Sequence, residues 1–271
     1  MIRLAVRVRA EQAELVLAEL LELVPSGVEE VRLADGTTEY AVYGAPGELP
    51  ALPDLQAAAG GALIEVTTAE IADDWPERWR RFHRPLVLDG RLTVRPPWEP
   101  AGATPLDVVI DPGQAFGTGA HATTRLCLEL MLELPVAGAF VDLGCGSGVL
   151  AIVGARLGWA PVIALDNDPA SVVAARENAR ANAVELEVRR FDLRHESLPD
   201  APTVAANLLA PLLVDLANRL AADERLPAQL IAGGMLAEET ERVVGSLAAA
   251  GLRERERRQH GEWAALLLES N

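Results

Sequence analysis

The 271-residue sequence contains no lysine, and all 24 of its basic residues are arginine. Against these stand 40 acidic residues, which give a formal net charge of −16. Proteins that bind nucleic acid usually carry a basic face, so this balance argues against direct binding of DNA or RNA. An acidic protein instead favours small molecules or basic protein partners, which long-range electrostatic attraction steers toward it.

Cysteine and long apolar runs are also scarce. Cys127 and Cys145 are too few for a disulfide scaffold, and neither belongs to a CxxC pair. No apolar run reaches the roughly 18 residues that span a bilayer, and the alternating start MIRLAVRVRA lacks the apolar block of an export signal. His83, His195 and His260 have no ligand-like neighbours in the sequence. We therefore expect a cytoplasmic protein with no membrane segment and no metal site.

The first part of the chain predicts a small α+β unit. Ile2–Val8 alternates as a half-buried strand does, and 11–24 has helical spacing. Two strand-like runs flank Asp35-Gly36, which is a strong hairpin signal. A second short helix over 50–61 and a strand over 62–70 complete the order β-α-β-β-α-β, which predicts a ferredoxin-like unit. Through Thr68 this unit has 4 Arg and 11 Asp or Glu, so it carries much of the acidity.

A connector follows this unit. The run DDWPERWRRFHRPLVL places Trp75 and Trp79 four residues apart, on one face of a helix, which we interpret as a packed linker helix rather than a substrate contact. The proline-rich run RPPWEPAGATP marks a boundary near residue 100. We predict an N-terminal domain over 1–69, a linker over 70–100 and a larger domain over 101–271.

The larger domain alternates short apolar runs with helical patterns. This order predicts an α/β domain with a doubly wound parallel sheet and helices on both faces. The strand-like runs are VVID, AFVDL, PVIALD, ELEVRRFD, PTVAAN and QLIAGG. The run RERERR at 253–258 mixes both charges and predicts a solvated edge strand, and GEWAALLLE predicts a final strand in a hairpin with it.

The segment FVDLGCGSGVLAIVGARLG predicts a nucleoside site. A strand ends at Asp142, the glycines Gly144, Gly146 and Gly148 follow, and a helix begins. Such glycines let the backbone approach a ligand, and the helix start offers unpaired N–H groups. The next strand ends in Asp166, where an acid can accept hydrogen bonds from ribose hydroxyls. The spacing G-x-G-x-G differs from the G-x-G-x-x-G of dinucleotide enzymes, so a nicotinamide oxidoreductase is disfavoured.

A second glycine-rich segment, DPGQAFGTGAHATTRL, spans 111–126. It lacks the Gly-Lys-Ser/Thr ending of a phosphate-binding loop, so a nucleoside triphosphate is not the expected ligand. Thr123 and Thr124 also suit a helix N-cap, as Asp166 suits a cap of the helix from Pro169. A structural role and a site-lining role for His121 both remain open. Cys145 has no nearby histidine motif, so we do not expect a nucleophile there.

These motifs resemble a known family. The runs DLGCGSG and LDNDP resemble motifs I and II of class I S-adenosylmethionine-dependent methyltransferases. The runs DPGQAFGTGAHATT, DWPERWRRFHRPL with VRPPW, and VAANLLA resemble signatures of the ribosomal protein L11 methyltransferase (PrmA) family. The resemblance runs from about Asp73 to the C-terminus. It implies a Rossmann-like class I methyltransferase sheet with an antiparallel C-terminal strand, and the N-terminal unit matches in size and expected architecture only.

The resemblance also implies roles for individual residues. S-adenosylmethionine would be held by four groups of residues: motif glycines, the ribose acid, the asparagine of VAANLLA and residues of the 111–126 segment. These are Gly144, Gly146, Asp166, Asn207, Phe116, Gly117, Thr118 and Thr124. Asn207 and Leu208 would act at the site of methyl transfer. The N-terminal unit would dock a basic ribosomal protein, and we expect a monomer. The lack of lysine fits GC-rich codon usage, and it also fits a lysine-modifying enzyme that avoids modifying itself.

Asn207 carries information on the acceptor. It is followed by Leu208, Leu209 and Ala210 rather than by Pro-Pro-Tyr, the form found in relatives that methylate planar amide or base nitrogens. The sequence therefore favours an amine acceptor, such as lysine ε-amines or the N-terminal α-amine of L11. Two alternatives remain open at this point. One is a lysine methyltransferase for another protein, of the electron-transfer flavoprotein subunit type, and the other is a cofactor-binding assembly factor without catalysis.

Overall fold

A computed structural model describes residues 2–9, 12–13, 16, 20, 29–33, 35–44, 63–70, 84–112, 121–223 and 225–270. The chain divides into two compact units, Met1–Phe82 and His83–Asn271. Within the described ranges, no helix has both the length and the apolar character needed to cross a membrane.

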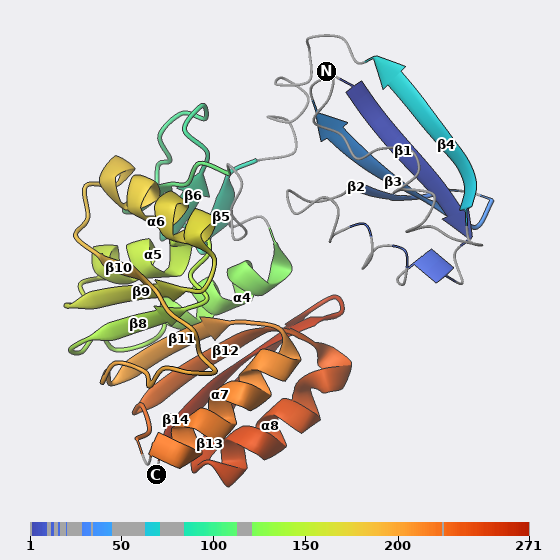
Figure 1. The fold of residues 1–271 in the computed structure, drawn as a ribbon. Coiled ribbons are helices and arrows are strands. Elements are labelled where there is room, and N and C mark those ends of the chain that lie inside the picture. Colours follow the sequence, from blue (N-terminus) through green and yellow to red (C-terminus); the bar gives the residue numbers. More distant parts are fainter. Residues whose placement is uncertain are drawn as a thin grey trace. The chain divides into compact units, whose positions relative to one another are not determined.

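The first unit is built on a four-stranded antiparallel sheet with the order β2-β3-β1-β4 (Figure 1). Its strands are β1 (Ile2–Arg9), β2 (Glu29–Arg32), β3 (Thr37–Gly44) and β4 (Leu63–Glu70). The hairpin predicted at Asp35-Gly36 is confirmed, because the Leu33 N–H donates to the Thr37 carbonyl at 2.8 Å and closes the turn. The strand order agrees with a ferredoxin-like unit. Of the two expected helices, 50–61 and most of 11–24 lie outside the described residues.

One face of this sheet is covered by apolar side chains with helical spacing. Ala13, Val16 and Leu20 are buried against residues of β1, namely Leu4, Val6 and Val8. The buried Tyr40 hydroxyl donates to the Ala13 carbonyl at 2.9 Å, which satisfies its polar end. The unit therefore has its own small core.

The second unit contains a seven-stranded sheet with the order β10-β9-β8-β11-β12-β14-β13 (Figure 1). The first five of these strands are parallel, whereas β14 is antiparallel to β12 and β13 to β14. The predicted doubly wound sheet with an antiparallel C-terminal strand is confirmed. The strands are β8 (Phe140–Leu143), β9 (Val162–Asp166), β10 (Glu187–Arg190), β11 (Thr203–Asn207), β12 (Gln229–Leu236), β13 (Leu252–His260) and β14 (Trp263–Ser270).

Helices cover both faces of this sheet, as Figure 1 shows. Side chains alternate between two cores: Phe140 packs on the side of α4 and α5, and Val141 packs on the side of α7 and α8. This alternation places Asp142 on the same side as Phe140. The helices are α4 (Ala122–Met131), α5 (Val149–Leu157), α6 (Pro169–Ala181), α7 (Ala210–Asp223) and α8 (Thr240–Ala249), with the short 3-10 helix η3 (Ala237–Glu239) before α8.

A separate three-stranded sheet was not anticipated. It joins β5 (Leu86–Leu88), β6 (Leu92–Arg95) and β7 (Leu106–Val109) in that order, and β6 and β7 are parallel. The strand expected at 108–111 is therefore part of this small sheet rather than of the large one. Arg95 fixes the pairing, because its Nε and Nη2 donate to the Asp107 carboxylate at 2.7 to 3.0 Å.

The charged run at 253–258 forms the edge strand β13, as predicted. Arg257 pairs with Glu254 and Glu241, and Arg258 pairs with Glu133. Charged side chains on an exposed edge discourage pairing with another chain. The closing strand β14 pairs with β13 in the predicted hairpin.

Candidate functional site

The motif residues converge at the carboxyl ends of the parallel strands. The order of the large sheet reverses between β8 and β11, which lie side by side. In open α/β sheets a ligand binds outside the carboxyl ends of the strands at such a switch point. Gly144 follows β8 there, and Asn207 ends β11.

The glycine loop 144–148 leaves β8 and enters α5. The Gly144 and Cys145 N–H groups both donate to the Leu165 carbonyl, at 2.8 and 3.0 Å, so the loop is tied to the end of β9. Gly144 has a left-handed backbone with φ of 72°. A Cβ at this position would lie 2.3 Å from Leu208 Cδ2. The left-handed backbone favours glycine here, and any side chain would also displace the Leu208 side chain.

Asp166 lies at the end of β9 and binds the same loop. Its Oδ2 accepts from the Gly146 N–H at 2.8 Å, and its Oδ1 accepts from the Asp168 N–H at 2.9 Å. The N-cap of α6 is Asp168, whose Oδ1 accepts from the Ala170 N–H. The alternative role of Asp166 as a helix cap is therefore wrong. Each carboxylate oxygen accepts more than one hydrogen bond, so Asp166 retains acceptor capacity for ligand hydroxyls.

Asn207 is held from α4 and has one open acceptor. Its Nδ2 donates to Thr124 Oγ1 at 3.3 Å, which joins the end of β11 to the first turn of α4. Its Oδ1 is buried and has no hydrogen-bond partner among the described residues. A buried acceptor without a partner costs about 1–3 kcal/mol. This orphaned oxygen therefore fits a ligand or substrate that donates an N–H group.

The neighbouring strand β12 bends away to make room for Asn207 and Leu208. Its register with β14 shifts between Ala232 and Met235, where Gly233 and Gly234 lie. A Cβ at Gly233 would lie 2.4 Å from Cys127 Sγ and 3.1 Å from Asn207 Oδ1, and one at Gly234 would lie 2.5 Å from the Leu208 carbonyl oxygen. The sequence analysis did not assign these two glycines to the site. A glycine pair inside a strand pattern is a signal for such a bulge or close approach.

Asp142 lies beneath the glycine loop, fully buried. Its Oδ2 accepts from the Ala151 N–H at 2.9 Å, and its Oδ1 has no partner among the described residues. Burial, with a smaller contribution from the charge of Asp166, raises the pKa of Asp142 to about 7 against the lowering effect of the Ala151 hydrogen bond. Burial also raises the pKa of the Cys145 thiol, with the two carboxylates adding to the effect. The thiol is therefore protonated at neutral pH and is a poor nucleophile.

A cleft of about 290 Å³ opens between these elements. Its lining includes residues of the motifs after β8, β9 and β11. It also includes a stretch after β10 that was not predicted to belong to the site. The first set is Gly144, Asp166, Asn167 and Leu208, and the second is Phe191, Asp192, Leu193, Arg194 and His195. Asp192 follows the end of β10 just as Asp166 ends β9, and this position was the signal that could have identified it.

His195, for which the sequence showed no partner, pairs with Asp192 at this cleft. Its Nδ1 lies 2.7 Å from Asp192 Oδ2. This hydrogen bond and the one from the Arg194 N–H lower the pKa of Asp192 below its usual range. The pair places a negative charge beside the cleft. Across all the described residues, no cluster of three or more His, Cys, Asp or Glu is arranged to hold a metal ion.

His121 caps α4. Its Nδ1 accepts from the Thr123 N–H at 3.4 Å and lies 2.9 Å from Thr123 Oγ1. Its ring packs edge-on against Trp263, with 4.7 Å between the ring centroids, and burial lowers its pKa. The structure therefore gives the cap to His121 rather than to Thr123 or Thr124. Three predicted cofactor residues, Phe116, Gly117 and Thr118, lie outside the described residues.

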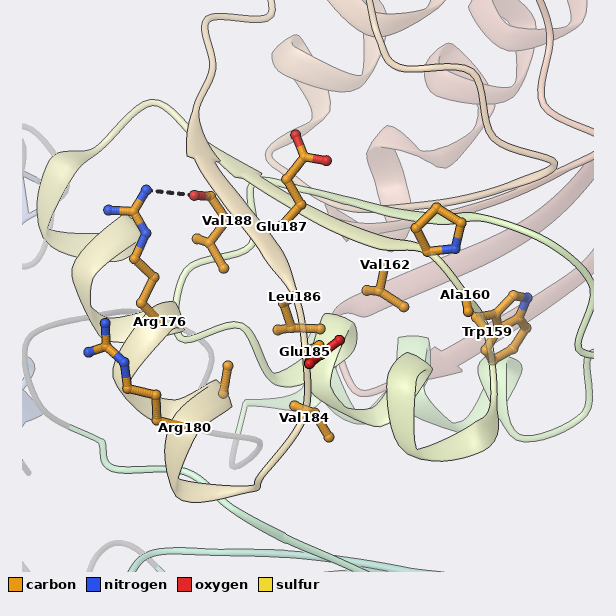
Figure 2. Close-up of a pocket in the computed structure, with 12 residues that line it drawn as sticks. Trp159, Ala160, Val162, Arg176, Arg180, Val184, Glu185, Leu186, Glu187 and Val188 are labelled. Atoms are coloured by element: carbon orange, nitrogen blue, oxygen red, sulfur yellow. Dashed lines mark hydrogen bonds between the residues drawn. The ribbon is translucent and has the colours of Figure 1, made fainter.

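A larger cavity, of about 690 Å³, lies at the opposite edge of the sheet (Figure 2). Val162 and Glu187, at the amino ends of β9 and β10, line it together with Trp159. Arg176 donates to the Val188 carbonyl at its rim, at 2.6 Å. Of the predicted site residues that the structure describes, none lines this cavity. Size alone therefore does not make it the candidate site.

Comparison with known proteins agrees with the geometry. A family model described as "Ribosomal protein L11 methyltransferase (PrmA)" matches residues 5–271. A ribosomal protein L11 methyltransferase of Geobacter metallireducens is 40% identical over 218 residues, which cover 78% of this chain and 71% of that protein. One from Symbiobacterium thermophilum is 38% identical over 198 residues, which cover 72% of this chain and 65% of that protein. The chain thus spans about two thirds of the length of these relatives.

A solved structure is also similar. The crystal structure of a ribosomal protein L11 methylase from Lactobacillus delbrueckii subsp. bulgaricus is 28% identical and superposes with a TM-score of 0.58. The match covers 70% of this chain and 100% of that chain.

Proposed function

Because the chain belongs to the ribosomal protein L11 methyltransferase (PrmA) family, we propose that it transfers methyl groups from S-adenosylmethionine to amines of ribosomal protein L11. The acceptors are lysine ε-amines, the N-terminal α-amine, or both. The observation that carries the proposal is the meeting of Gly144, Asp166 and Leu208 around one cleft at the switch point of the sheet, next to Asn207 at the end of β11. The family match over residues 5–271 favours this function over another protein acceptor or a non-catalytic assembly factor.

The residues at the cleft fit S-adenosylmethionine. Gly144 lies in close contact with the Leu208 side chain, and both residues line the cleft together with Asp166. Asp166 lies beside the loop with acceptor capacity for ribose hydroxyls, and Asp192 adds negative charge next to it. We propose that Gly144, Gly146 and Asp166 hold the cofactor, with Thr124 and Asn207 at its other side. The cofactor, when bound, supplies a methyl group activated by a positively charged sulfonium.

Phe116, Gly117 and Thr118 stay predictions as cofactor contacts. They precede His121, which caps α4, and Thr124, which receives the hydrogen bond from Asn207. This position in the chain supports a place near the cofactor.

The acceptor nitrogen must present a lone pair to the methyl carbon. A solvated lysine is protonated at neutral pH, since its ordinary pKa is about 10.4. Partial desolvation in the cleft lowers that pKa, and the proton leaves to water before attack. The N–C bond then forms as the C–S bond breaks, in line. Alignment of this kind contributes up to about 7–11 kcal/mol to catalysis, so the chain acts chiefly by positioning.

Asn207 is the proposed positioning group for the amine. Its Oδ1 is buried without a partner among the described residues, and an amine N–H would satisfy it. The side chain of Leu208, the next residue, lies beside Gly144, where the chain after β11 meets the glycine loop. Asn207→Ala should therefore lower turnover strongly and change cofactor affinity less. Full turnover in Asn207→Ala would refute this role.

We propose that the N-terminal unit, residues 1–69, docks the protein substrate, and that residues 70–100 lead from it to the catalytic domain, residues 101–271. Within that segment, β5 and β6 already belong to the compact unit His83–Asn271. The N-terminal unit has more acidic than basic residues, which suits a basic partner that binds rRNA. We also propose that the enzyme acts as a cytoplasmic monomer.

Transfer of labelled methyl groups tests the proposed function. The acceptors are ribosomal proteins from a strain that lacks the enzyme, and the label is carried by S-adenosylmethionine. We expect label in one basic ribosomal protein, and its loss in Asp166→Ala. Cofactor binding without any labelled protein would count against L11 as the acceptor.

A further inference from the structure

Asn178 links the glycine loop to a second backbone segment of the domain. It lies on α6 and is only 3% exposed. Its Nδ2 donates to the Ser147 carbonyl at 2.9 Å, and its Oδ1 accepts from the Asp111 N–H at 2.9 Å. Both ends of the side-chain amide are therefore used, one of them inside the loop 144–148.

The same helix contacts this loop at a second point. A Cβ at Gly148 would lie 3.0 Å from Ala175 Cβ and 3.2 Å from Ala175 Cα, so α6 packs against the loop without spare volume. Ala175 and Asn178 are three residues apart and share one face of α6. At the start of α6, the Asp168 N–H donates to Asp166 at 2.9 Å. One helix therefore supports both the glycine loop and the acid at the end of β9.

We propose that Asn178 is a positioning residue for the methyl donor. By fixing the Ser147 carbonyl, it holds the loop in the shape that the cofactor needs before the cofactor binds. A loop with three glycines has a large conformational entropy when it is not held. Ordering it in advance lowers the cost of binding, so losing this hydrogen bond weakens cofactor affinity. The inference rests on the proposed placement of the cofactor at this loop.

Asn182, one turn further along α6, provides a matched control. It is 2% exposed, and its side-chain amide also pairs with a backbone. Its Oδ1 accepts from the Val109 N–H at 2.8 Å, and its Nδ2 donates to the Val109 carbonyl at 2.6 Å. Its Nδ2 also donates to the Asn178 carbonyl at 2.8 Å. Asn182 therefore ties the end of α6 to the same incoming segment as Asn178 does, and none of these three hydrogen bonds reaches the glycine loop.

Titration calorimetry with S-adenosylmethionine, on the full chain below its melting temperature, tests the proposal. We expect Asn178→Ala to raise Kd by about tenfold or more, which is the change expected when one buried hydrogen bond that orders the binding loop is lost. Asn182→Ala should raise Kd by less than about threefold. Both variants should lower Tm to a similar degree. Equal Kd values for the two variants, whatever their Tm, would overturn the proposal.

A second variant keeps the test sharp if Asn178→Ala does not fold. Asn178→Asp retains the acceptor for the Asp111 N–H but faces the Ser147 carbonyl with an oxygen. Protonation restores a donor there, so its affinity relative to the unchanged protein should improve as the pH falls from alkaline to mildly acidic. A ratio that does not vary with pH would contradict the positioning role.

Asp166→Ala separates failure of this inference from failure of the proposed site. Wild-type affinity in Asp166→Ala would show that the cofactor site itself is misplaced. Weak binding in Asp166→Ala together with wild-type binding in Asn178→Ala would reject only the role of Asn178.

Discussion

Asp142 is a buried carboxyl whose replacement should change how stability depends on pH. Burial raises its pKa from 3.8 to about 7. Between these two values the folded chain binds one proton more than the unfolded chain does. Its contribution to stability is therefore fully present below about pH 4 and is lost as the pH rises through about 7. The free energy of unfolding falls by about 1.4 kcal/mol per pH unit in this interval, on the order of 4 kcal/mol in total.

Asp142→Asn has no such proton to lose and keeps an oxygen for the Ala151 N–H. The stability of the unchanged protein minus that of the variant should fall by about 1.4 kcal/mol per pH unit between about pH 4 and 7, and level off outside this range. Urea unfolding at closely spaced pH values measures the difference. Parallel profiles for the two proteins would refute the assignment of a protonated Asp142.

Asp107 provides a control of opposite sign. The hydrogen bonds from Arg95 lower the pKa of Asp107 below its usual range. Its contribution to stability is present above the unfolded pKa and is lost as the pH falls through the folded one. Asp107→Asn should therefore be less stable than the unchanged protein at neutral pH. This difference in stability should shrink as the pH falls, which is the opposite pH dependence to that of Asp142→Asn.

Three further changes follow from contacts at the site. Gly144→Ala places a Cβ 2.3 Å from Leu208 Cδ2 at a φ of 72°, so S-adenosylmethionine affinity measured by calorimetry should fall about tenfold or more. Gly233→Ala places a Cβ 2.4 Å from the buried Cys127 Sγ and 3.1 Å from Asn207 Oδ1, so Tm should fall and steady-state assays should show a lower kcat for methyl transfer. Leu209, two residues after Asn207, is 65% exposed. Leu209→Ala should therefore raise KM for the protein acceptor and change the free energy of unfolding by less than about 0.5 kcal/mol.

Matched controls exist for two of these changes. At Gly245, on α8, a Cβ would meet nothing within 4 Å, so Gly245→Ala should leave kcat unchanged. Leu226, 37% exposed, precedes β12 at its amino end, away from the motif residues, so Leu226→Ala should leave KM unchanged. If Gly245→Ala lowers kcat as Gly233→Ala does, or Leu226→Ala raises KM as Leu209→Ala does, the effect is not specific to the site.

The fold of the large sheet could be predicted from the sequence, as could the place of several motif residues at one edge of it, because both depend on local patterns. Alternating runs such as FVDL and VIALD end at Leu143 and Asp166, and parallel strands bring those ends to one edge. The glycine spacing after Asp142 and the asparagine ending β11 therefore indicated which residues would meet.

What the sequence did not predict depends on tertiary contacts. The bulge at Gly233 and Gly234 exists because the backbone of Leu208 needs that space, and no local pattern specifies which neighbour will approach. The small sheet of β5, β6 and β7 depends on the Arg95–Asp107 pair, whose members are 12 residues apart across a proline-rich loop. Such pairings are set by burial and charge in the folded chain rather than by periodicity.

The central claim is that this site transfers methyl groups to amines of ribosomal protein L11. Its most direct test is the intact mass of purified, unmethylated L11 after incubation with the enzyme and S-adenosylmethionine, with Asn207→Ala beside it. The account predicts mass increments of whole methyl groups on amine positions, which are lost or strongly reduced in the variant. An unchanged L11 mass from an enzyme that binds the cofactor would contradict the claim.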